Sequence, residues 1–347
     1  MKSKKYFFYN LKKLPFLIGI GSFLLLANAC TKSPERAPIA RSYYYWKTNF
    51  LLSQKEQLNL LDTLKITTLY LRFFDVHYDE KLATAMPVGN LTVTTKIPEQ
   101  LKIVPVVYIT NETLQRIKST VCDSLAARIS QKIHSKIAAN GLSQQVKEWQ
   151  LDCDWSAKTR QKYFAILLKI KALNPSIRLS ATIRLHQLKY PEQTGVPPVQ
   201  RGMLMLYNMS DVAKAETKNS ILDIAVTRRY INEKTRYKLP LDLAFPAFAW
   251  GALFRGAHFE GLLNNWNEAT CSKQSFLQHT TANNWVCTQD TVVGARYWRR
   301  GDRLRLEGGD AKSASQLYDL CKNITAKDTV HIAYFHWNGT SGAKFDF

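Results

Sequence analysis

The sequence predicts an α/β protein built as one (β/α)8 barrel with a polar insertion before its last strand. Strand-like apolar runs alternate with amphipathic helical runs along the chain, a pattern typical of parallel strands joined by helices. Hydrophobic residues make up 46% of the 347 residues, enough for a large core. Neither an internal repeat nor a low-complexity linker divides the chain. We therefore expect a single domain over residues 42–347, since barrels of this kind reach that length as one domain.

Seven strands are indicated by runs rich in β-branched and aromatic residues, of which ITTLYLRFFD is the first. The expected ranges are 66–75, 102–110, 148–155, 177–185, 202–209, 241–250 and 329–338. A closed barrel needs one more strand. We expect it between residues 75 and 100, around GNLTVTTKI.

Helices are expected between these strands wherever apolar residues recur with helical spacing. The ranges are 53–64, 122–140, 159–175 and 221–237. The stretch ALNPSIRLS ends one helix, turns, and begins the next strand. Residues 255–312 are different, because they are polar and contain Gly-Asp and Gly-Gly turns. They predict a long insertion before the last strand, and insertions of this length are usually functional.

The N-terminus predicts export. MKSKKYFFYNLKK carries five lysines and no acid, and a short apolar run follows it, as in a secretory signal peptide. Ala29-Cys30 is similar to a bacterial lipoprotein cleavage site, so residues 1–29 are expected to be removed and Cys30 to be lipidated. Residues 30–41, which include a polar TKSPERAP stretch, would form a tether. The alternative is an ordinary signal peptide followed by a chance cysteine.

These features predict a lipid-anchored protein of the bacterial cell envelope, on the outer membrane or the periplasmic face. Without the five signal lysines, 43 basic residues remain against 27 acidic ones, a net charge of +16. Such a surface attracts polyanions, but the bases are spread along the chain and no nucleic acid partner is expected. No phosphate loop, Ser-His-Asp order or metal-ligand spacing occurs in the sequence, so neither a cofactor nor a metal is expected.

The most informative stretch is QLDCDW, residues 150–155. Side chains alternate along a strand, which places Gln150, Asp152 and Asp154 on one face and Cys153 with its apolar neighbours on the other. Two carboxylates in a dry core are costly, so the acidic face should line the barrel near its mouth, where sites of such barrels lie. The alternative is a structural acid pair, bound to Arg184 or to a lysine.

LDCDW resembles the DxxDxDxE motif of glycoside hydrolase family 18, the chitinase-like TIM barrels. Asp152 and Asp154 match the second and third aspartates. MLYN resembles the MxYD motif of that family through Met205 and Tyr207, and Trp337 matches a tryptophan on which the sugar stacks. The series YYYWKTNF, LYLRFFD, VPVVYIT, LDCDW and YFHWN also resembles a group of bacterial lipoproteins, a likeness that implies no activity.

Three positions depart from the family pattern. Trp149 stands at the first aspartate, Asn208 at the aspartate of MxYD, and Ser156 at the glutamate that the family uses as general acid. Serine cannot protonate a leaving oxygen at neutral pH. Asp154 could serve instead if Asp152 beside it raised its pKa, because like charges push one value upward.

Other acids that follow strand ends could replace the missing one, although each could also be an ordinary loop or capping acid. They are Asp75, Glu112 and Glu260. Aromatic residues near the predicted mouth could stack on sugar rings or simply pack in the core. They are Phe74, Tyr108, Tyr207, Phe248, Trp250 and Trp337, of which the two tryptophans are the strongest candidates.

The leading hypothesis is a carbohydrate-active barrel, a divergent glycoside hydrolase-like protein with a glycan as its partner. The alternative is a glycan-binding protein without catalytic activity, or an envelope interaction protein on the same fold. Asp152 and Asp154 are the candidate catalytic residues. The candidate binding residues are Tyr207, Asn208, Trp250, Trp337, Asp75 and Glu112.

Overall fold

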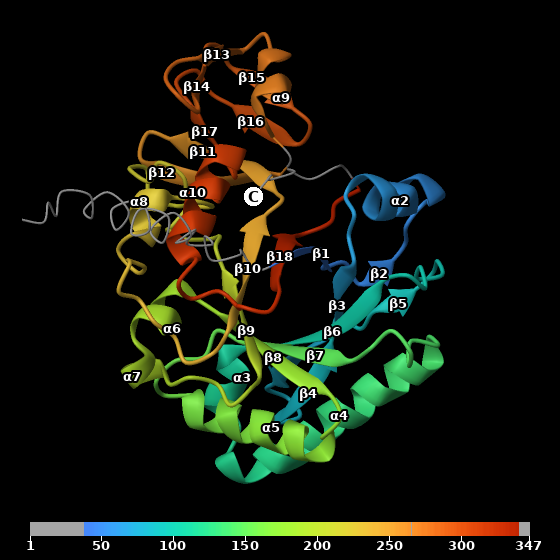
Figure 1. Ribbon diagram of the computed structural model, residues 1–347. Coiled ribbons are helices and arrows are strands. Elements are labelled where there is room, and N and C mark those ends of the chain that lie inside the picture. Colours follow the sequence, from blue (N-terminus) through green and yellow to red (C-terminus); the bar gives the residue numbers. More distant parts are fainter. Residues whose placement is uncertain (1–37, 265, 340–347) are drawn as a thin grey trace, which may run out of the picture. The chain divides into compact units, whose positions relative to one another are not determined.

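Eight parallel strands close into a barrel in the computed structural model, which describes residues 38–264 and 266–339 (Figure 1). The predicted (β/α)8 TIM barrel is thereby confirmed. The barrel strands are β1 (Ile39–Tyr45), β3 (Thr68–Asp79), β6 (Lys102–Ile109), β7 (Glu148–Asp152), β8 (Arg178–Ile183), β9 (Arg201–Met205), β10 (Leu241–Pro246) and β18 (Val330–Phe335). Strand β1 closes the ring by pairing with β18 on one side and β3 on the other.

The eighth strand does not lie between residues 75 and 100, where it was expected. It is β1, the run IARSYYY, whose Ser42 lies beside Thr68 of β3 and Ile332 of β18. The expected tether therefore ends too late at residue 41, because the barrel already begins at Ile39. The run begins with polar residues, so its composition resembles that of a linker. Its three tyrosines are nevertheless buried, as in a barrel strand.

The region between residues 75 and 100 instead extends the edge of the barrel. Strand β4 (Thr84–Val88) pairs antiparallel with β3, and β5 (Thr92–Val93) pairs only with the short β2 (Asn49–Phe50). The helix expected at 53–64 forms as α2 (Gln54–Leu58) followed by a π-helical turn (Asn59–Thr63).

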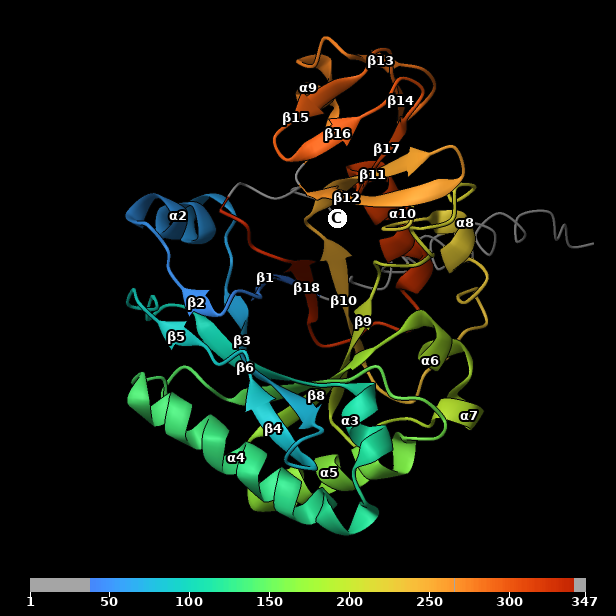
Figure 2. The same cartoon turned by 180° about the vertical axis from the view of Figure 1, so that it is seen from behind.

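Helices cover the outside of the barrel unevenly. The two longest, α4 (Cys122–Ala139) and α5 (Arg160–Leu173), lie side by side outside β6, β7 and β8 (Figures 1 and 2). The others are shorter: α3 (Asn111–Arg116), α6 (Leu185–Lys189), α7 (Pro191–Thr194), α8 (Ile224–Thr227) and α10 (Ala311–Cys321). The helix expected at 221–237 is thus wrong in length, since only one turn, capped by Asp223, is helical.

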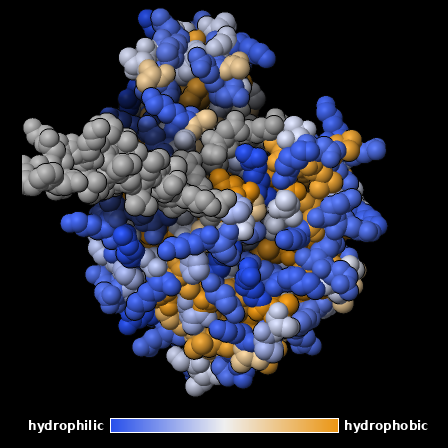
Figure 3. Space-filling model, in the orientation of Figure 1, coloured by the Kyte–Doolittle hydropathy of each residue, from blue (hydrophilic) through white to orange (hydrophobic). Residues whose placement is uncertain are grey.

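The insertion is a small antiparallel sheet with its own core. The strand expected at 241–250 ends at Pro246, and the chain then enters β11. The insertion comprises β11 (Ala249–Arg255), β12 (His258–Asn264), α9 (Glu268–Ser272), β13 (Leu277–His279), β14 (Asn284–Cys287), β15 (Thr291–Val293), β16 (Arg296–Trp298) and β17 (Arg303–Gly308). Leu253, Trp285, Trp298 and Leu304 fill its interior. Hydrophilic side chains cover most of its surface in Figure 3.

Cys271 and Cys287 both lie in the core of the insertion, yet they are free thiols. Cys287 Sγ instead donates a hydrogen bond to the carbonyl oxygen of Gln289 at 3.0 Å. Within the part of the chain that the structure describes, no helix is long and apolar enough to cross a membrane.

Candidate functional site

The polar face of β7 points into the barrel, as the alternation of its side chains predicts. Gln150 Oε1 accepts a hydrogen bond from Tyr44 Oη of β1 at 2.5 Å, across the barrel interior. On the opposite face, the ring of Trp149 packs edge-on against His134 of α4, with 5.0 Å between the ring centroids. Cys153 is fully buried on that side. The acids of QLDCDW therefore face the interior, near the carboxyl ends of the strands.

Asp152 is the buried member of the acid pair, with 8% of its surface exposed. Its Oδ1 accepts a hydrogen bond from Thr182 Oγ1 of β8 at 2.6 Å. Burial raises the pKa of Asp152 to about 6; Asp154 and Asp75 push it in the same direction, against Arg184. Burial, rather than the like charge of its neighbour, is the largest cause of the raised pKa of Asp152.

Asp154 is paired with a base. Arg184, which directly follows β8, donates from Nε to Asp154 Oδ1 at 2.5 Å and from Nη2 to Oδ2 at 3.3 Å. These two hydrogen bonds fix both side chains. The side chain of Asp154 remains 40% exposed and that of Arg184 remains 26% exposed. This is the structural acid pair that stood as the alternative to an active site, with Arg184 as the partner.

Ser156 shapes the turn that leads into α5. Its backbone N–H donates to Thr159 Oγ1 at 2.9 Å, and the two hydroxyl oxygens lie 3.3 Å apart. Thr159 Oγ1 in turn donates to Asn111 Oδ1 at 2.7 Å. The position that carries the general acid in the resembled family therefore holds a small residue that stabilises the loop.

Asp75, at the mouth end of β3, is also held by an arginine. Arg72 Nε donates to Asp75 Oδ1 at 2.8 Å, and its Nη2 contacts Oδ2. Asp75 is 6% exposed, and its charge contributes to the raised pKa of Asp152. It thus lies within electrostatic reach of the acid pair, but as half of an ion pair.

The other two expected acids lie in unrelated pairs. Glu112, in the first turn of α3, is 3.4 Å from Arg116 one helical turn later, and both side chains are exposed. Glu260 lies on β12 of the insertion, where its Oε2 is 3.5 Å from Arg255 Nη1. The structure does not bring either side chain into contact with Asp154.

Aromatic rings form a wall on the other side of the mouth, centred on Phe335 at the end of β18. Its ring stacks on Tyr207 with 4.9 Å between centroids and an angle of 22°. Trp46 and Tyr44 lie 5.4 Å and 5.5 Å from it, and Phe248 lies 6.2 Å away. Trp46, Phe248 and Phe335 are partly exposed, so the wall presents ring surface at the mouth.

Trp250 extends this wall onto the insertion. Its ring packs against Phe248 with 5.2 Å between centroids, and its Nε1 donates to Glu307 Oε2 at 3.0 Å. It belongs to β11, the first strand of the insertion, rather than to a barrel strand. The insertion thus contributes directly to the mouth.

Trp337 does not contribute to the wall, contrary to the expectation that it stacks on a sugar. It is 1% exposed, and its ring packs edge-on against Tyr43 at 5.3 Å. Strand β18 ends at Phe335, so the alternation that pointed Trp337 toward the mouth does not extend that far. Phe335 takes the inward position at the end of the last strand.

A pocket of about 370 Å³ opens beside the acid pair. Asp154, Arg184 and Tyr207 form one side of it, and the exposed Asn208 lies at its rim with a positive φ of 53°. His186, Met209 and Tyr230 complete the polar and aromatic lining. The pocket therefore joins the expected residues Asp154, Tyr207 and Asn208 in one place.

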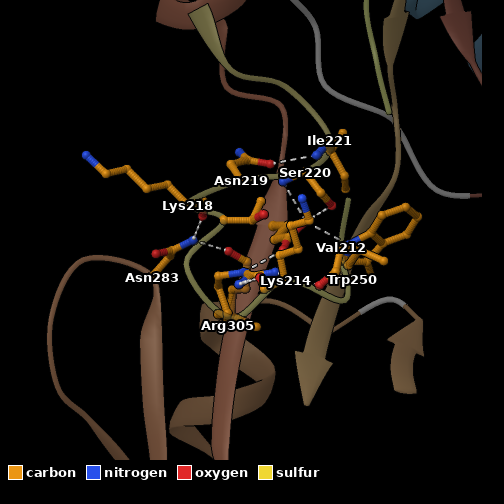
Figure 4. A network of polar contacts seen from close by, with 12 residues as sticks. Val212, Lys214, Lys218, Asn219, Ser220, Ile221, Trp250, Asn283 and Arg305 are labelled. Carbon is orange, nitrogen blue, oxygen red and sulfur yellow. Dashed lines mark hydrogen bonds and ion pairs between the residues drawn. The ribbon is translucent and has the colours of Figure 1, made fainter. Parts of the chain in front are cut away.

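The insertion is fastened to the loop after β9 by hydrogen bonds from two buried, ion-paired side chains of β17 (Figure 4). Arg305 Nε donates to Glu307 Oε1 at 2.6 Å, while the other nitrogens of Arg305 donate to the carbonyl oxygens of Val212, Lys214 and Ala215. Glu307 Oε2 accepts from the N–H of Ser220 at 2.9 Å, from its hydroxyl group, and from Trp250. These bonds fix Trp250 and the loop together.

Sequence reasoning did not identify Phe335, Trp46 or the bases Arg72 and Arg184 as parts of the site. Arg184 had been considered only as a structural partner. A signal for the arginines did exist, since each lies at the mouth end of a strand and has an acid within the same or the neighbouring strand. Within residues 38–264 and 266–339, no group of three or more acidic, histidine or cysteine side chains could hold a metal ion.

Comparisons with known proteins find likeness in structure alone. No protein-family model matches the sequence, and no curated protein matches it either. The spore cortex-lytic enzyme SleL of Bacillus megaterium QM B1551 is similar over 88% of this chain and 72% of its own, with a TM-score of 0.54 and 12% identity.

Two chitinases are similar at lower scores. The chitinase of Chromobacterium violaceum has a TM-score of 0.49 at 9% identity over 84% of this chain and 93% of its own. The family 18 chitinase of Cycas revoluta, solved with (GlcNAc)3, has a TM-score of 0.46 at 10% identity over 86% and 94%. The likeness to SleL concerns the fold, a closed barrel of eight parallel strands with surrounding helices.

Proposed function

We propose that this protein is a glycan-binding barrel of the cell envelope that holds a cell-wall-type glycan at its mouth without cleaving it. The observation that carries the proposal is the mouth itself, where a partly exposed aromatic wall faces acids that are already paired or buried. Ring faces such as those of Trp46 and Phe335 suit the apolar faces of sugars, while Asp154 and Arg184 offer polar groups to hydroxyls.

Hydrolysis is less well supported, because it needs a carboxylic acid positioned to protonate the leaving oxygen. Asp75 and Asp154 are each bound by an arginine, and Ser156 occupies the family's acid position. One observation favours a second candidate function, a divergent hydrolase. Asp152, with a pKa of about 6, is protonated in part of its population at neutral pH and could serve as an acid.

We also propose that the chain is anchored by a lipid on Cys30, on the outer membrane or the periplasmic face. The support comes from the sequence: a basic leader, an apolar run over residues 14–29 and Ala29-Cys30 at its end. Residues 1–37, which contain the leader, Cys30 and most of the tether, lie outside the described residues. Mass spectrometry of Cys30 in membrane-extracted protein tests the anchor directly.

A binding screen tests the glycan proposal. We expect chitooligosaccharides or peptidoglycan fragments to bind on a glycan array, with affinity confirmed by calorimetry. Trp46→Ala should weaken binding about threefold to tenfold, since a stacked aromatic contributes about 0.5–1.5 kcal/mol. Tyr297→Ala is the matched control, because Tyr297 is a 49% exposed aromatic on the hairpin of the insertion, β15–β16.

The same samples separate the two candidate functions. Under the binding proposal, the wild-type protein releases no product from a bound glycan, and Asp154→Asn changes affinity only. Under the hydrolase alternative, product appears, and Asp152→Asn or Asp154→Asn removes it while binding remains. If no glycan binds, or if Trp46→Ala binds as tightly as the wild type, the carbohydrate proposal fails and an envelope interaction protein is left.

A further inference from the structure

The end of the barrel opposite the mouth is strongly basic. Exposed lysines or arginines stand at or just before the first residue of six of the eight barrel strands. We call the surface they form the basal face; it comprises Lys65, Lys102, Lys147, Arg178, Lys238 and Lys327. Because all eight strands are parallel, these side chains gather at one end of the barrel.

Acids at this end do not neutralise the basal face. Asp242 is 2% exposed and lies 3.6 Å from the buried Arg201, which also bonds to the exposed Asp328 at 2.5 Å. Glu99 forms an exposed pair with Lys96 at 2.6 Å. These three acids are therefore satisfied by bases outside the basal face. Glu148 is different, because its Oε2 lies 4.0 Å from Arg178 Nη1. Even with this pair, six bases face one acid, so positive charge remains in excess on the basal face.

Two hollows lie within the basal face. One, of about 770 Å³, includes Lys102 and Lys147 in its lining; the other, of about 620 Å³, includes Lys238 and Lys327. Arg178 lines both of them. Basic side chains around open concavities suit compact anionic groups such as phosphates, which enter the hollows and meet several cations at once.

The basal face is also the end of the barrel that lies nearer in the chain to Cys30, the residue proposed to carry the lipid. Strand β1 runs parallel to the other strands and begins at Ile39, so the chain enters the barrel at the basal face. Cys30 precedes Ile39 by nine residues. Even a fully extended segment of that length spans only about 30 Å. A lipid on Cys30 would hold the basal face within that distance of the membrane.

We infer that the basal face binds the anionic headgroups of phospholipids and directs the mouth of the barrel away from the membrane. The inference rests on the lipid anchor proposed for Cys30, but it concerns a separate contact of the folded barrel. One lipid chain gives only marginal membrane binding, and a basic surface is a common second contribution. With both, the glycan site would point toward the wall rather than toward the bilayer.

Vesicle sedimentation tests the basal face apart from the anchor. The protein is the processed chain, residues 30–347 with Cys30→Ser, which carries no lipid and retains the compact unit that starts at Pro38. We expect it to sediment with vesicles containing 30% phosphatidylglycerol at low salt, and not with pure phosphatidylcholine. Binding should fall steeply as salt is raised, because exposed charges are screened.

Charge reversals identify the surface. Lys102→Glu, Lys147→Glu and Lys238→Glu together should lower binding at least about 100-fold, since each base near an anionic surface contributes about fivefold. The matched control has the same net charge: Lys158→Glu, Lys214→Glu and Lys312→Glu, at exposed lysines away from the basal face. It should retain most of the binding. If the triple variant does not fold, the single variant Lys147→Glu is used instead. We expect it to lower vesicle binding at least about fivefold.

Three results would overturn the inference: equal loss in both triple variants, unchanged binding in the basal variants, or equal binding to neutral vesicles. Binding to an anionic polysaccharide but not to phosphatidylglycerol vesicles would also overturn it. Failure of the anchor is a distinct result, because it appears as an unmodified Cys30 in the mass spectrum and leaves the vesicle measurement unchanged.

Discussion

Asp152 ends β7 and Asp154 follows it by two residues, and their surroundings give the two carboxylates different roles. Asp152 lies in the interior, where a single threonine hydroxyl bonds to it and burial raises its pKa to about 6. Asp154 lies nearer to solvent and accepts two hydrogen bonds from Arg184. The sequence shows two equivalent aspartates, and only the depth of each in the barrel distinguishes them.

The raised pKa of Asp152 predicts a pH dependence of stability. In the unfolded chain its pKa is near 3.8, and in the folded chain it is about 6, so the folded state binds the proton more tightly. The resulting stabilisation is complete below about pH 4 and is lost as the pH rises through 6. We expect a loss of about 2 kcal/mol in the free energy of unfolding between pH 4 and pH 7 from this residue.

Urea unfolding of the wild type and Asp152→Asn at the two pH values checks this. The variant should lack that part of the pH dependence, and the remainder, to which the buried Asp242 contributes in the same direction, should persist. Glu99→Gln, on the surface, is the control and should behave as the wild type. A variant with the full wild-type pH dependence would show that Asp152 does not titrate in this range.

At the scale of elements, Arg305 and Glu307 of β17 form an ion pair, and their further hydrogen bonds tie the insertion to the loop after β9. Both side chains are almost fully buried, at 4% and 0% exposed. Removing one charge of a buried pair leaves the other uncompensated, which costs about 3–5 kcal/mol. Glu307→Gln should therefore lower the free energy of unfolding by about 3 kcal/mol and loosen the loop.

Two measurements follow this variant. Chemical unfolding gives the stability change, and limited trypsin digestion should cut faster after Lys214 and Lys218, which lie in the fastened loop. The control is Asp319→Asn, which breaks an exposed pair with Lys322 and should cost less than about 1 kcal/mol. Unchanged digestion in Glu307→Gln would mean that the loop is held by other contacts, such as Asn283 Nδ2 to the carbonyl oxygen of Lys218.

Local sequence composition predicts seven of the eight barrel strands but not β1. Seven strands could be predicted because each is a continuous apolar run buried on both faces, as in parallel sheets generally. Strand β1 escaped prediction because IAR begins it and a Pro-containing polar segment precedes it, so composition alone assigns the start to a linker. Its partners β18 and β3 identify it as a strand, and that pairing is not visible in local sequence.

The site could be predicted only in part, for a related reason. Alternation within β7 predicts that Gln150 and Asp152 point inward, as they do, because it depends on neighbours along one strand. Asp154, beyond the end of the strand, lies at the mouth with its side chain 40% exposed. The pairing of Asp154 with Arg184 and of Asp75 with Arg72 depends on side-chain reach at the strand ends. Trp337 was misplaced because the chain leaves the strand at Phe335, a change of direction without a local signal.

At the scale of the whole molecule, closure of the barrel depends on β1. A chain that starts at Pro38 contains all eight barrel strands, whereas one that starts at Lys47 lacks β1 and leaves β3 and β18 with unpaired edges. We expect the first to unfold cooperatively and the second to lose the cooperative transition or to aggregate, as exposed strand edges do. Thermal unfolding followed by circular dichroism, with light scattering, separates the two. A cooperative transition in the shorter chain would contradict this role of β1.

The pairing of β1 with β18 also sets the order of events during synthesis. Ile39 leaves the ribosome early, but its partner Val330 emerges 291 residues later, almost at the end of the chain. Until then β1 and β10 each lack the partner that β18 supplies, and the ring cannot close. Contacts between such distant segments make folding slow, because the loop between them must first be ordered. For the export proposed above, this delay is an advantage, because a barrel that cannot close before its last strand is made can still pass unfolded through a narrow translocation channel.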